Sequence, residues 1–177
     1  MKKANLTLGA GLILLAGSLL VPGIASAQAL KTPIEGSHTD CSALGEPERE
    51  WVDEDGNIHF RGQRYSCRHA GDVRGREVGV ADGDFDPDAL VRFEHGTFSF
   101  TGRILGVNAS ATGHWTLECT GTQVGMLNCT EEHVWHLEDG RLLKFTVTFV
   151  GPGFPRPYTG FLLDPPGLGA ERRRRSR

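Results

Sequence analysis

Four ionisable side chains in the second half of the chain could carry chemistry, and two of them are histidines. They are His114, Glu118, Glu132 and His136. An imidazole and a carboxylate that share a cavity can recognise a ligand or transfer protons, because burial and mutual contact shift their pKa values. Such groups also need partners, since an unpaired charge inside a protein is costly. Whether the four meet depends on the strands that carry them.

The dipeptide Asp139-Gly140 predicts the turn of a β-hairpin, because Asp-Gly tolerates the positive φ angles of a two-residue loop. The segment that follows has apolar side chains at alternate positions, namely Leu143, Phe145, Val147 and Phe149. Alternation of this kind defines one face of a strand. A two-residue loop pairs Leu143 with His136. The same register brings Glu132 opposite Val147, so both ionisable groups are expected on the core face.

A second hairpin is predicted between the segments that contain Cys119 and Cys129. The two cysteines lie symmetrically about Val124, and Gly125 suits the left-handed position of a three-residue loop. Opposed cysteines of a non-hydrogen-bonded strand pair have about the separation that a disulfide needs. This register therefore predicts a Cys119–Cys129 disulfide.

Extending both hairpins brings the four ionisable groups to one side of the interior. The hairpin centred on Val124 places His114 beside Val134, with Glu118 further along the same face. The four side chains would then line a lumen that is otherwise apolar, and would either bind a ligand or pair with one another. A bulge in either strand would turn them outward and bring inside a different set, namely Trp115, Leu117, Trp135 and Leu137. The direction of the two tryptophans decides between these alternatives.

The remaining cysteines predict a second disulfide. With Cys119 joined to Cys129, exclusion leaves Cys41 paired with Cys67. The chain has no Cys-x-x-Cys pattern, which argues against a zinc ribbon or a thioredoxin-like redox site. Two disulfides indicate an oxidising compartment.

Residues 1–27 match a secretory signal peptide. Two lysines precede an apolar run that ends in Ala-Ser-Ala at residues 25–27. Cleavage after Ala27 would leave a secreted or periplasmic protein without a membrane-spanning segment. We expect this protein to comprise an N-terminal arm (28–46), a β-barrel domain (47–163) and a disordered Pro/Gly/Arg tail (164–177).

The pattern from Trp51 onward is typical of an all-β domain. Short apolar segments alternate with turn residues, and 24 glycines and 9 prolines argue against long helices. His95-Gly96 is interpreted as a two-residue turn that sets Phe93 opposite Phe98. The segments together predict an antiparallel, closed or nearly closed β-barrel of about eight strands, because closure hides strand edges.

The order of three short motifs resembles a known family of barrels. His59-Phe60-Arg61-Gly62 is followed by Gly96-Thr97-Phe98 and then by Gly113-His114-Trp115. This order resembles small exported β-barrel proteins of the allene oxide cyclase and dirigent type, over about residues 50–150. The resemblance implies a barrel with a lumen for a small, mostly apolar molecule, and in some relatives cyclase or stereoselective coupling chemistry. It assigns no catalytic residue to this chain.

Two further patterns resemble metal sites, but neither has the residues or the spacing that a metal site requires. The carboxylates from Asp82 to Asp88 alternate as at the start of a calcium loop, but Pro87 and Phe93 stand where an EF-hand needs Gly and Glu. A solvated acidic loop that caps the next segment is the preferred interpretation. His133 and His136 are three residues apart, so in a strand they point to opposite faces and cannot share an ion. No metal and no cofactor are predicted.

The charge of the protein narrows the possible classes of function. Residues 28–170 hold 21 acidic and 12 basic side chains, and such a body repels nucleic-acid phosphates, so no nucleic-acid partner is expected. The favoured hypothesis is a barrel that binds a small, largely apolar ligand in its lumen. The alternatives are a cofactor-free cyclase or isomerase that uses a lumen carboxylate and histidine, and an interaction module with a packed core.

Overall fold

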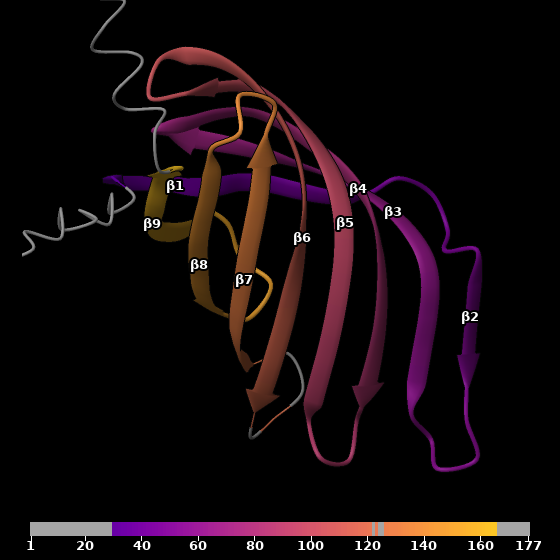
Figure 1. The fold of residues 1–177 in the computed structure, drawn as a ribbon. Coiled ribbons are helices and arrows are strands. Elements are labelled where there is room, and N and C mark those ends of the chain that lie inside the picture. The colour runs from indigo at the N-terminus through magenta and orange to yellow at the C-terminus, as the bar shows by residue number, and fades with distance from the viewer. Residues whose placement is uncertain (1–29, 122, 124–125, 166–177) are drawn as a thin grey trace, which may run out of the picture.

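The chain folds into antiparallel β-strands that lie side by side and curve into a barrel (Figure 1). The computed structural model describes residues 30–121, 123 and 126–165. In these residues the strands are β1 (Leu30–Ala43), β2 (Arg49–Val52), β3 (Ile58–Gly71), β4 (Val73–Asp86), β5 (Val91–Ile104), β6 (Val107–Gly121), β7 (Leu127–Leu137), β8 (Leu142–Val150) and β9 (Arg156–Asp164). The prediction of an all-β fold is confirmed. In the described part of the chain, no helix is long and apolar enough to cross a membrane.

Eight of the strands close the barrel. Neighbours follow the order β1-β9-β8-β7-β6-β5-β4-β3, and β1 pairs with β3 to complete the circle. The second half of β3 forms this seam, where Cys41 lies opposite Cys67. The first half of β3 pairs instead with the short strand β2, which begins after β1 has ended. The predicted closed, eight-stranded barrel is confirmed, and closure pairs the edges that an open sheet would expose.

The structure corrects the expected boundary between arm and barrel. The predicted N-terminal arm includes residues 30–43, but these form β1, whose residues 30–38 pair with β9 and whose later residues pair with β3 to close the barrel. Of the predicted arm, residues 44–46 lie in the segment that connects β1 to β2. The predicted signal peptide (1–27) lies outside the described residues. The predicted tail begins within β9, which ends at Asp164, and residues 166–177 also lie outside the described part.

His95-Gly96 is not a turn, contrary to the prediction. Strand β5 runs through it, and the reversal into β6 occurs at Leu105-Gly106, both of which have positive φ angles. The glycine serves a packing purpose instead. The indole of Trp115 lies against Gly96, and a Cβ added there would come 2.7 Å from its Cε2 atom. Phe93 is consequently exposed while Phe98 points into the core, so the two do not form the expected pair.

Asp139-Gly140 does lie in a turn, but the loop is one residue longer than predicted. The backbone N–H of Leu137 donates to the carbonyl of Arg141, which leaves a three-residue loop. Gly140 occupies the left-handed position of this loop with a φ of 83°. Leu143 is therefore opposite Trp135 rather than His136. Because side chains alternate along a strand, this shift of one residue exchanges the two faces of β7.

Both predicted disulfides are present. Cys119 is joined to Cys129 across the β6–β7 hairpin, in the register expected from the sequence. Cys41 is joined to Cys67 across the seam between β1 and β3. Two disulfides indicate an oxidising, extracytoplasmic location.

The two ends of the barrel interior differ. Near the β5–β6 and β7–β8 turns the interior is filled by fully buried apolar side chains, including Val73, Ile104, Trp135 and Leu143. The opposite end, toward Glu94, Leu117 and Glu131, holds charged groups and a cavity. Between the two ends lies a layer of buried polar side chains, which we call the polar layer and which includes His38, His69, Glu77 and His133. This layer contains the candidate site.

Candidate functional site

The four ionisable residues predicted to line the lumen lie on the outer face of the wall. His114, Glu118, Glu132 and His136 are all exposed. Trp115 and Trp135 point inward instead and are 6% and 0% exposed. The prediction that these four residues line the lumen is therefore wrong. The cause is the loop at Asp139-Gly140, which is one residue longer than predicted and exchanges the two strand faces. The alternative set that a register change would bring inside is the one observed.

Three other histidines meet in the lumen. His38 comes from β1, His69 from β3 and His133 from β7, and each is at most 5% exposed. The ring centroid of His38 is 4.6 Å from that of His69 and 5.3 Å from that of His133. His133 is buried whereas His136 is exposed, so the prediction that these two point to opposite faces is confirmed.

His69 belongs to a chain of hydrogen bonds that crosses the lumen. The indole Nε1 of Trp115 donates to the Tyr65 hydroxyl at 2.6 Å, and that hydroxyl donates to Glu77 Oε1 at 2.7 Å. The other carboxylate oxygen of Glu77 accepts from His69 Nε2 at 3.3 Å. His69 Nδ1 lies 3.3 Å from the hydroxyl of Tyr158, which can donate to it. All polar atoms of His69 and Glu77 are thus satisfied, as burial requires.

Within this chain of hydrogen bonds, the surroundings favour an ionised Glu77 and neutral hydroxyl groups on Tyr65 and Tyr158. Burial by itself would raise the pKa of Glu77, but the hydrogen bond from His69, the electrostatic influence of the nearby His133 and His69 rings, and the bond from Tyr65 lower it below its ordinary value. Burial raises the pKa of Tyr65, and the neighbouring Glu77 charge raises it further. The pKa of Tyr158 is raised chiefly by burial. Both hydroxyls therefore remain donors.

His133 forms a second, shorter chain with its neighbours on β7. Its Nε2 donates to Glu131 Oε1 at 2.7 Å, and its Nδ1 accepts from the indole Nε1 of Trp135 at 3.3 Å. The ring stacks on Phe145 with centroids 4.3 Å apart. Because Glu131, His133 and Trp135 are spaced by two residues, they share the inward face of the strand.

His38 differs from the other two histidines because its polar atoms have no partner. It is 1% exposed, and neither Nδ1 nor Nε2 has a hydrogen bond within the described part of the chain. Burial lowers the pKa of His38 well below its ordinary value, and the nearby His133, His69 and Arg156 lower it further. The side chain is consequently a neutral imidazole with a free lone pair. Buried polar groups without partners are rare in folded proteins.

A cavity of about 240 Å³ lies beside this polar layer, and we call it the lumen cavity. Its wall is largely aromatic and apolar, with Phe60, Tyr65, Ala81, Trp115 and Leu117. Its charged groups are Arg92, Glu94, Glu131 and Arg156.

The charged groups of the lumen cavity are only partly exposed to water. Glu94 forms an ion pair with Arg92. Burial raises the pKa of Glu94 above its ordinary value, although Arg92 opposes this shift. The guanidinium of Arg156 lies over the ring of Phe149 at 3.7 Å, and burial lowers its pKa. The cavity thus combines apolar walls with a few polar groups, as small-molecule sites do.

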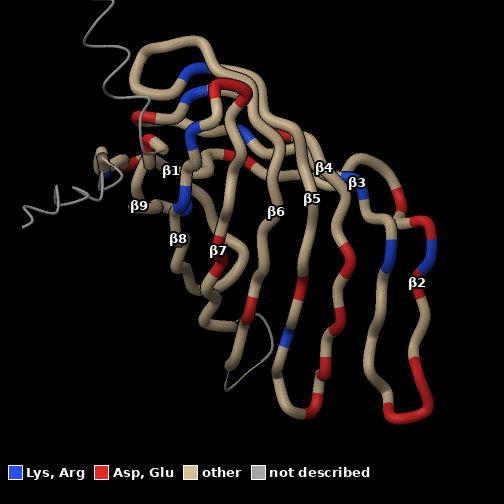
Figure 2. The backbone as a smooth tube through the Cα atoms, in the orientation of Figure 1, with Lys and Arg blue, Asp and Glu red and all other residues tan. Residues whose placement is uncertain are grey.

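The acidic segment predicted as a solvated, capping loop extends β4 and then caps the turn that follows. Figure 2 shows acidic positions along the end of β4 and the adjoining β2–β3 loop. Asp86 Oδ1 accepts hydrogen bonds from the backbone N–H groups of Asp88 and Ala89, and Asp82 accepts one from Gly62. Asp84 binds His59 and Arg61. These carboxylates therefore have protein partners, and their arrangement is not that of a calcium loop.

Trp135 belongs to the alternative inward set predicted from the sequence, but Glu131, His133 and His38 do not. Glu131 and His133 precede Trp135 by four and two residues, so the alternation that turns Trp135 inward also indicates these two. Nothing local indicates His38, because β1 reaches the site only through barrel closure.

Comparison of the chain with protein-family models, curated proteins and solved structures finds no significant match. The resemblance to the allene oxide cyclase and dirigent type therefore remains an expectation from the sequence motifs.

Proposed function

We propose that the barrel binds a small, largely apolar ligand with a single polar group in the lumen cavity. The observation that carries this proposal is a cavity of about 240 Å³ with an aromatic wall on a barrel whose other end is fully packed. Sites for drug-sized ligands usually measure roughly 300–1,000 Å³. The smaller volume here suits a molecule the size of a single aromatic ring, two fused rings or a short alkyl chain.

The composition of the wall indicates how such a ligand would lie. Its apolar part would pack on Trp115 and Leu117, where burial of apolar surface favours binding. Its polar group would face the side that holds Glu94 and Arg156. The indole of Trp115 is held in place by its hydrogen bond to Tyr65, so the protein itself fixes this part of the wall and less ordering is needed on binding.

We infer that residues 1–27 direct the chain out of the cytoplasm and that the barrel acts as a secreted or periplasmic protein, which the two disulfides support. A barrel with a ligand cavity is also what the resemblance to the allene oxide cyclase and dirigent type implies.

The proposal can be tested with a variant that fills the cavity. Isothermal titration of the purified protein with 2-naphthol, benzyl alcohol and 1-octanol should detect binding of at least one of them. Leu117→Trp places a larger side chain in the cavity and should abolish that binding. Thr116→Trp is the matched control, because Thr116 is the next residue of β6 and is exposed on the outer face. Equal binding by wild type and Leu117→Trp, or no binding of any of the three probes, would contradict the proposal.

A second candidate function is acid–base catalysis on the bound molecule, and Glu94 favours it. Its carboxyl group lines the cavity and has a pKa raised by burial, which suits a general acid. Mass spectrometry of small molecules that co-purify with wild type and with Glu94→Gln distinguishes the two candidates. A binding protein should retain the same compound in both. An isomerase or cyclase should yield product from wild type and unaltered substrate from Glu94→Gln.

A further inference from the structure

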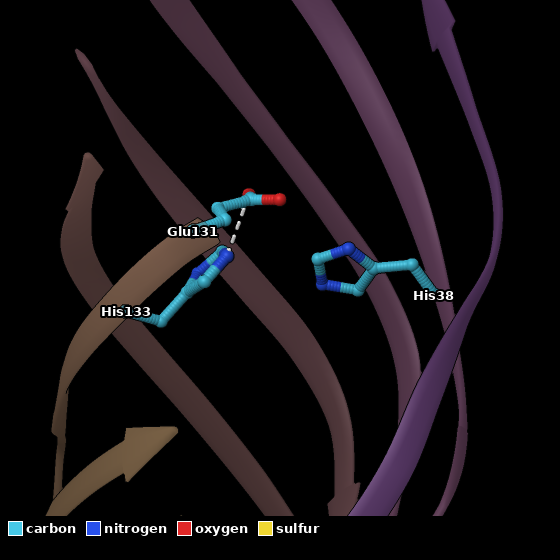
Figure 3. A group of neighbouring side chains, drawn as sticks. All are labelled: His38, Glu131 and His133. Carbon is cyan, nitrogen blue, oxygen red and sulfur yellow. Dashed lines mark hydrogen bonds and ion pairs between the residues drawn. The ribbon is translucent and has the colours of Figure 1, made fainter. Parts of the chain in front are cut away.

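Three buried side chains from opposite walls of the barrel face one another across the lumen. They are His38 on β1, and Glu131 and His133 on β7. Figure 3 shows the His38 imidazole directed toward the Glu131 carboxylate and the His133 ring. One nitrogen or oxygen ligand atom from each residue lies within 4.8 Å of those of the other two. We propose that these three residues bind a divalent transition-metal ion, and that the ion is Zn²⁺.

The state of His38 is the strongest support for this site. Its imidazole is almost completely buried and both ring nitrogens lack a hydrogen-bond partner in the described structure. Leaving such a group unsatisfied costs free energy, whereas a metal ion would use the free lone pair directly. His69 is the adjacent histidine, but its two nitrogens are already bound to Glu77 and Tyr158. His38 is therefore the residue available as a ligand.

The charge of the lumen also favours a cation. Glu131 and Glu77 are buried carboxylates, and the ion-pair partner of each is a histidine. Both histidines accept a hydrogen bond at Nδ1 and so bring no positive charge, and a buried carboxylate is costly without compensation. A divalent ion between Glu131 and the two imidazoles would supply that compensation.

The ligand types point to zinc. Two imidazoles and one carboxylate form the ligand set of several catalytic zinc sites, and they leave a fourth position open. The same set can bind iron, but Zn²⁺ has no redox chemistry and suits the oxidising location that the disulfides indicate. Hard cations such as Mg²⁺ and Ca²⁺ prefer oxygen ligands and should not bind here.

Binding requires a small rearrangement of the side chains. Zinc–nitrogen bonds of about 2.0 Å in a tetrahedral site put ligand atoms roughly 3.3 Å apart, so His38 must move closer. The 2.7 Å bond between His133 Nε2 and Glu131 must open. The Nε2 proton of neutral His133 moves to Nδ1, which frees the Nε2 lone pair for the metal. Nδ1 can then no longer accept the hydrogen bond from Trp135, so the indole environment changes on binding.

Zinc binding by these three residues does not depend on the proposed binding of an apolar ligand. Glu131 lines the lumen cavity as well, so the open coordination position would face the place where a ligand would bind. A water molecule could occupy that position when the cavity holds no ligand.

The experiment uses the full chain after removal of bound metals with a chelator. Titration with Zn²⁺ should show one ion bound per chain, a higher melting temperature and a change in tryptophan fluorescence. His38→Leu and Glu131→Gln should each weaken binding by at least ~100-fold, since even loss of a residue that only supports a ligand costs 10–100-fold. His136→Ala is the matched control, because His136 lies on the same strand but on the outer face.

Two measurements on His38→Leu separate a loss of zinc binding from a loss of folding. The variant removes an unsatisfied buried polar group, so without metal it should melt no lower than wild type. Unchanged Zn²⁺ affinity in this variant, or no effect of Zn²⁺ on wild type, would overturn the assignment. A loss of Zn²⁺ binding in His136→Ala equal to that in His38→Leu would also overturn it, because the ion would then be on the outer surface.

Discussion

The indole of Trp115 occupies the space that a side chain at Gly96 would need. A Cβ at Gly96 would lie 2.7 Å from Trp115 Cε2, and the same indole donates its Nε1 hydrogen to the Tyr65 hydroxyl. One glycine thus positions the first member of the hydrogen-bond chain that runs through Glu77 to His69. It also positions one wall of the lumen cavity.

Gly96→Ala should therefore displace the indole and break its bond to Tyr65. We expect a loss of about 1–3 kcal/mol in the free energy of unfolding, the usual range for overpacking, together with a changed tryptophan emission. Urea denaturation followed by fluorescence measures both. Gly153→Ala is the matched control, since an added Cβ there has nothing within 4 Å. Equal stability of the two variants would contradict the packing role.

The Cys41–Cys67 disulfide at the seam should limit hydrogen exchange in β1, whereas the Cys119–Cys129 disulfide in the hairpin should not affect it. Replacing Cys41 and Cys67 by alanine removes a cross-link between residues 26 positions apart, which on the chain-entropy model costs about 3 kcal/mol of unfolding free energy. It should also let β1 separate from β3, so the amides of β1 should exchange hydrogen faster. The Cys119→Ala/Cys129→Ala pair leaves a continuous hairpin and should not speed exchange in β1. Identical exchange patterns in the two variants would argue against a weak seam.

Leu105 should be a site where substitution stabilises the barrel. It has a φ of 52° in the β5–β6 turn, a conformation that costs a leucine roughly 1–2 kcal/mol, and its side chain is exposed. Leu105→Asn should raise the free energy of unfolding by about 1 kcal/mol, because asparagine tolerates this turn position. Leu105→Ala keeps the unfavourable conformation and should give no such gain. Thermal unfolding of the three proteins tests the prediction, and a gain from alanine equal to that from asparagine would refute it.

His59 should titrate above the ordinary range of histidine. Its Nδ1 is 2.6 Å from Asp84 Oδ1 and its Nε2 is 3.0 Å from Asp53 Oδ2. The hydrogen bond to Asp84, followed by that to Asp53, raises the pKa of His59 above 6.5. A raised folded-state pKa means that this group stabilises the fold below pH 6.5, and that the contribution disappears as the pH rises through the folded-state pKa.

Nuclear magnetic resonance titration of the His59 ring measures this shift directly. Asp84→Asn should lower the pKa of His59 and reduce the loss of stability on the alkaline side. Asp55→Asn serves as the control, because Asp55 lies in the same loop but contributes only its backbone N–H to Asp53. The explanation would fail if both variants moved the pKa of His59 equally.

Local patterns were sufficient for the elements whose partners are close in the sequence. The symmetric placement of Cys119 and Cys129 predicted the register of β6 and β7 correctly, because one short loop joins them. Alternating apolar residues in β8 predicted its inward face correctly at Leu143, Phe145 and Val147. These successes depend on side-chain alternation and on turn geometry, which neighbouring residues determine.

The lumen site could not be predicted in the same way. A turn at Asp139-Gly140 is compatible with a loop of two or three residues, and the difference exchanges His136 and Glu132 for His133, Glu131 and Trp135 on the inner face. The packed barrel selects the longer loop, because it buries Trp135 and leaves His136 in water.

Side-chain alternation, turn residues and cysteine spacing were enough to predict an all-β chain with two disulfides. The identity of the histidines that share the interior depends instead on how the barrel closes. His38 and His133 are far apart in the chain and meet because β1 closes the barrel between β9 and β3. Closure is a property of the whole sheet, in which the pairing of every strand contributes to the position of the seam. No local pattern can therefore specify which side chains face one another across the lumen.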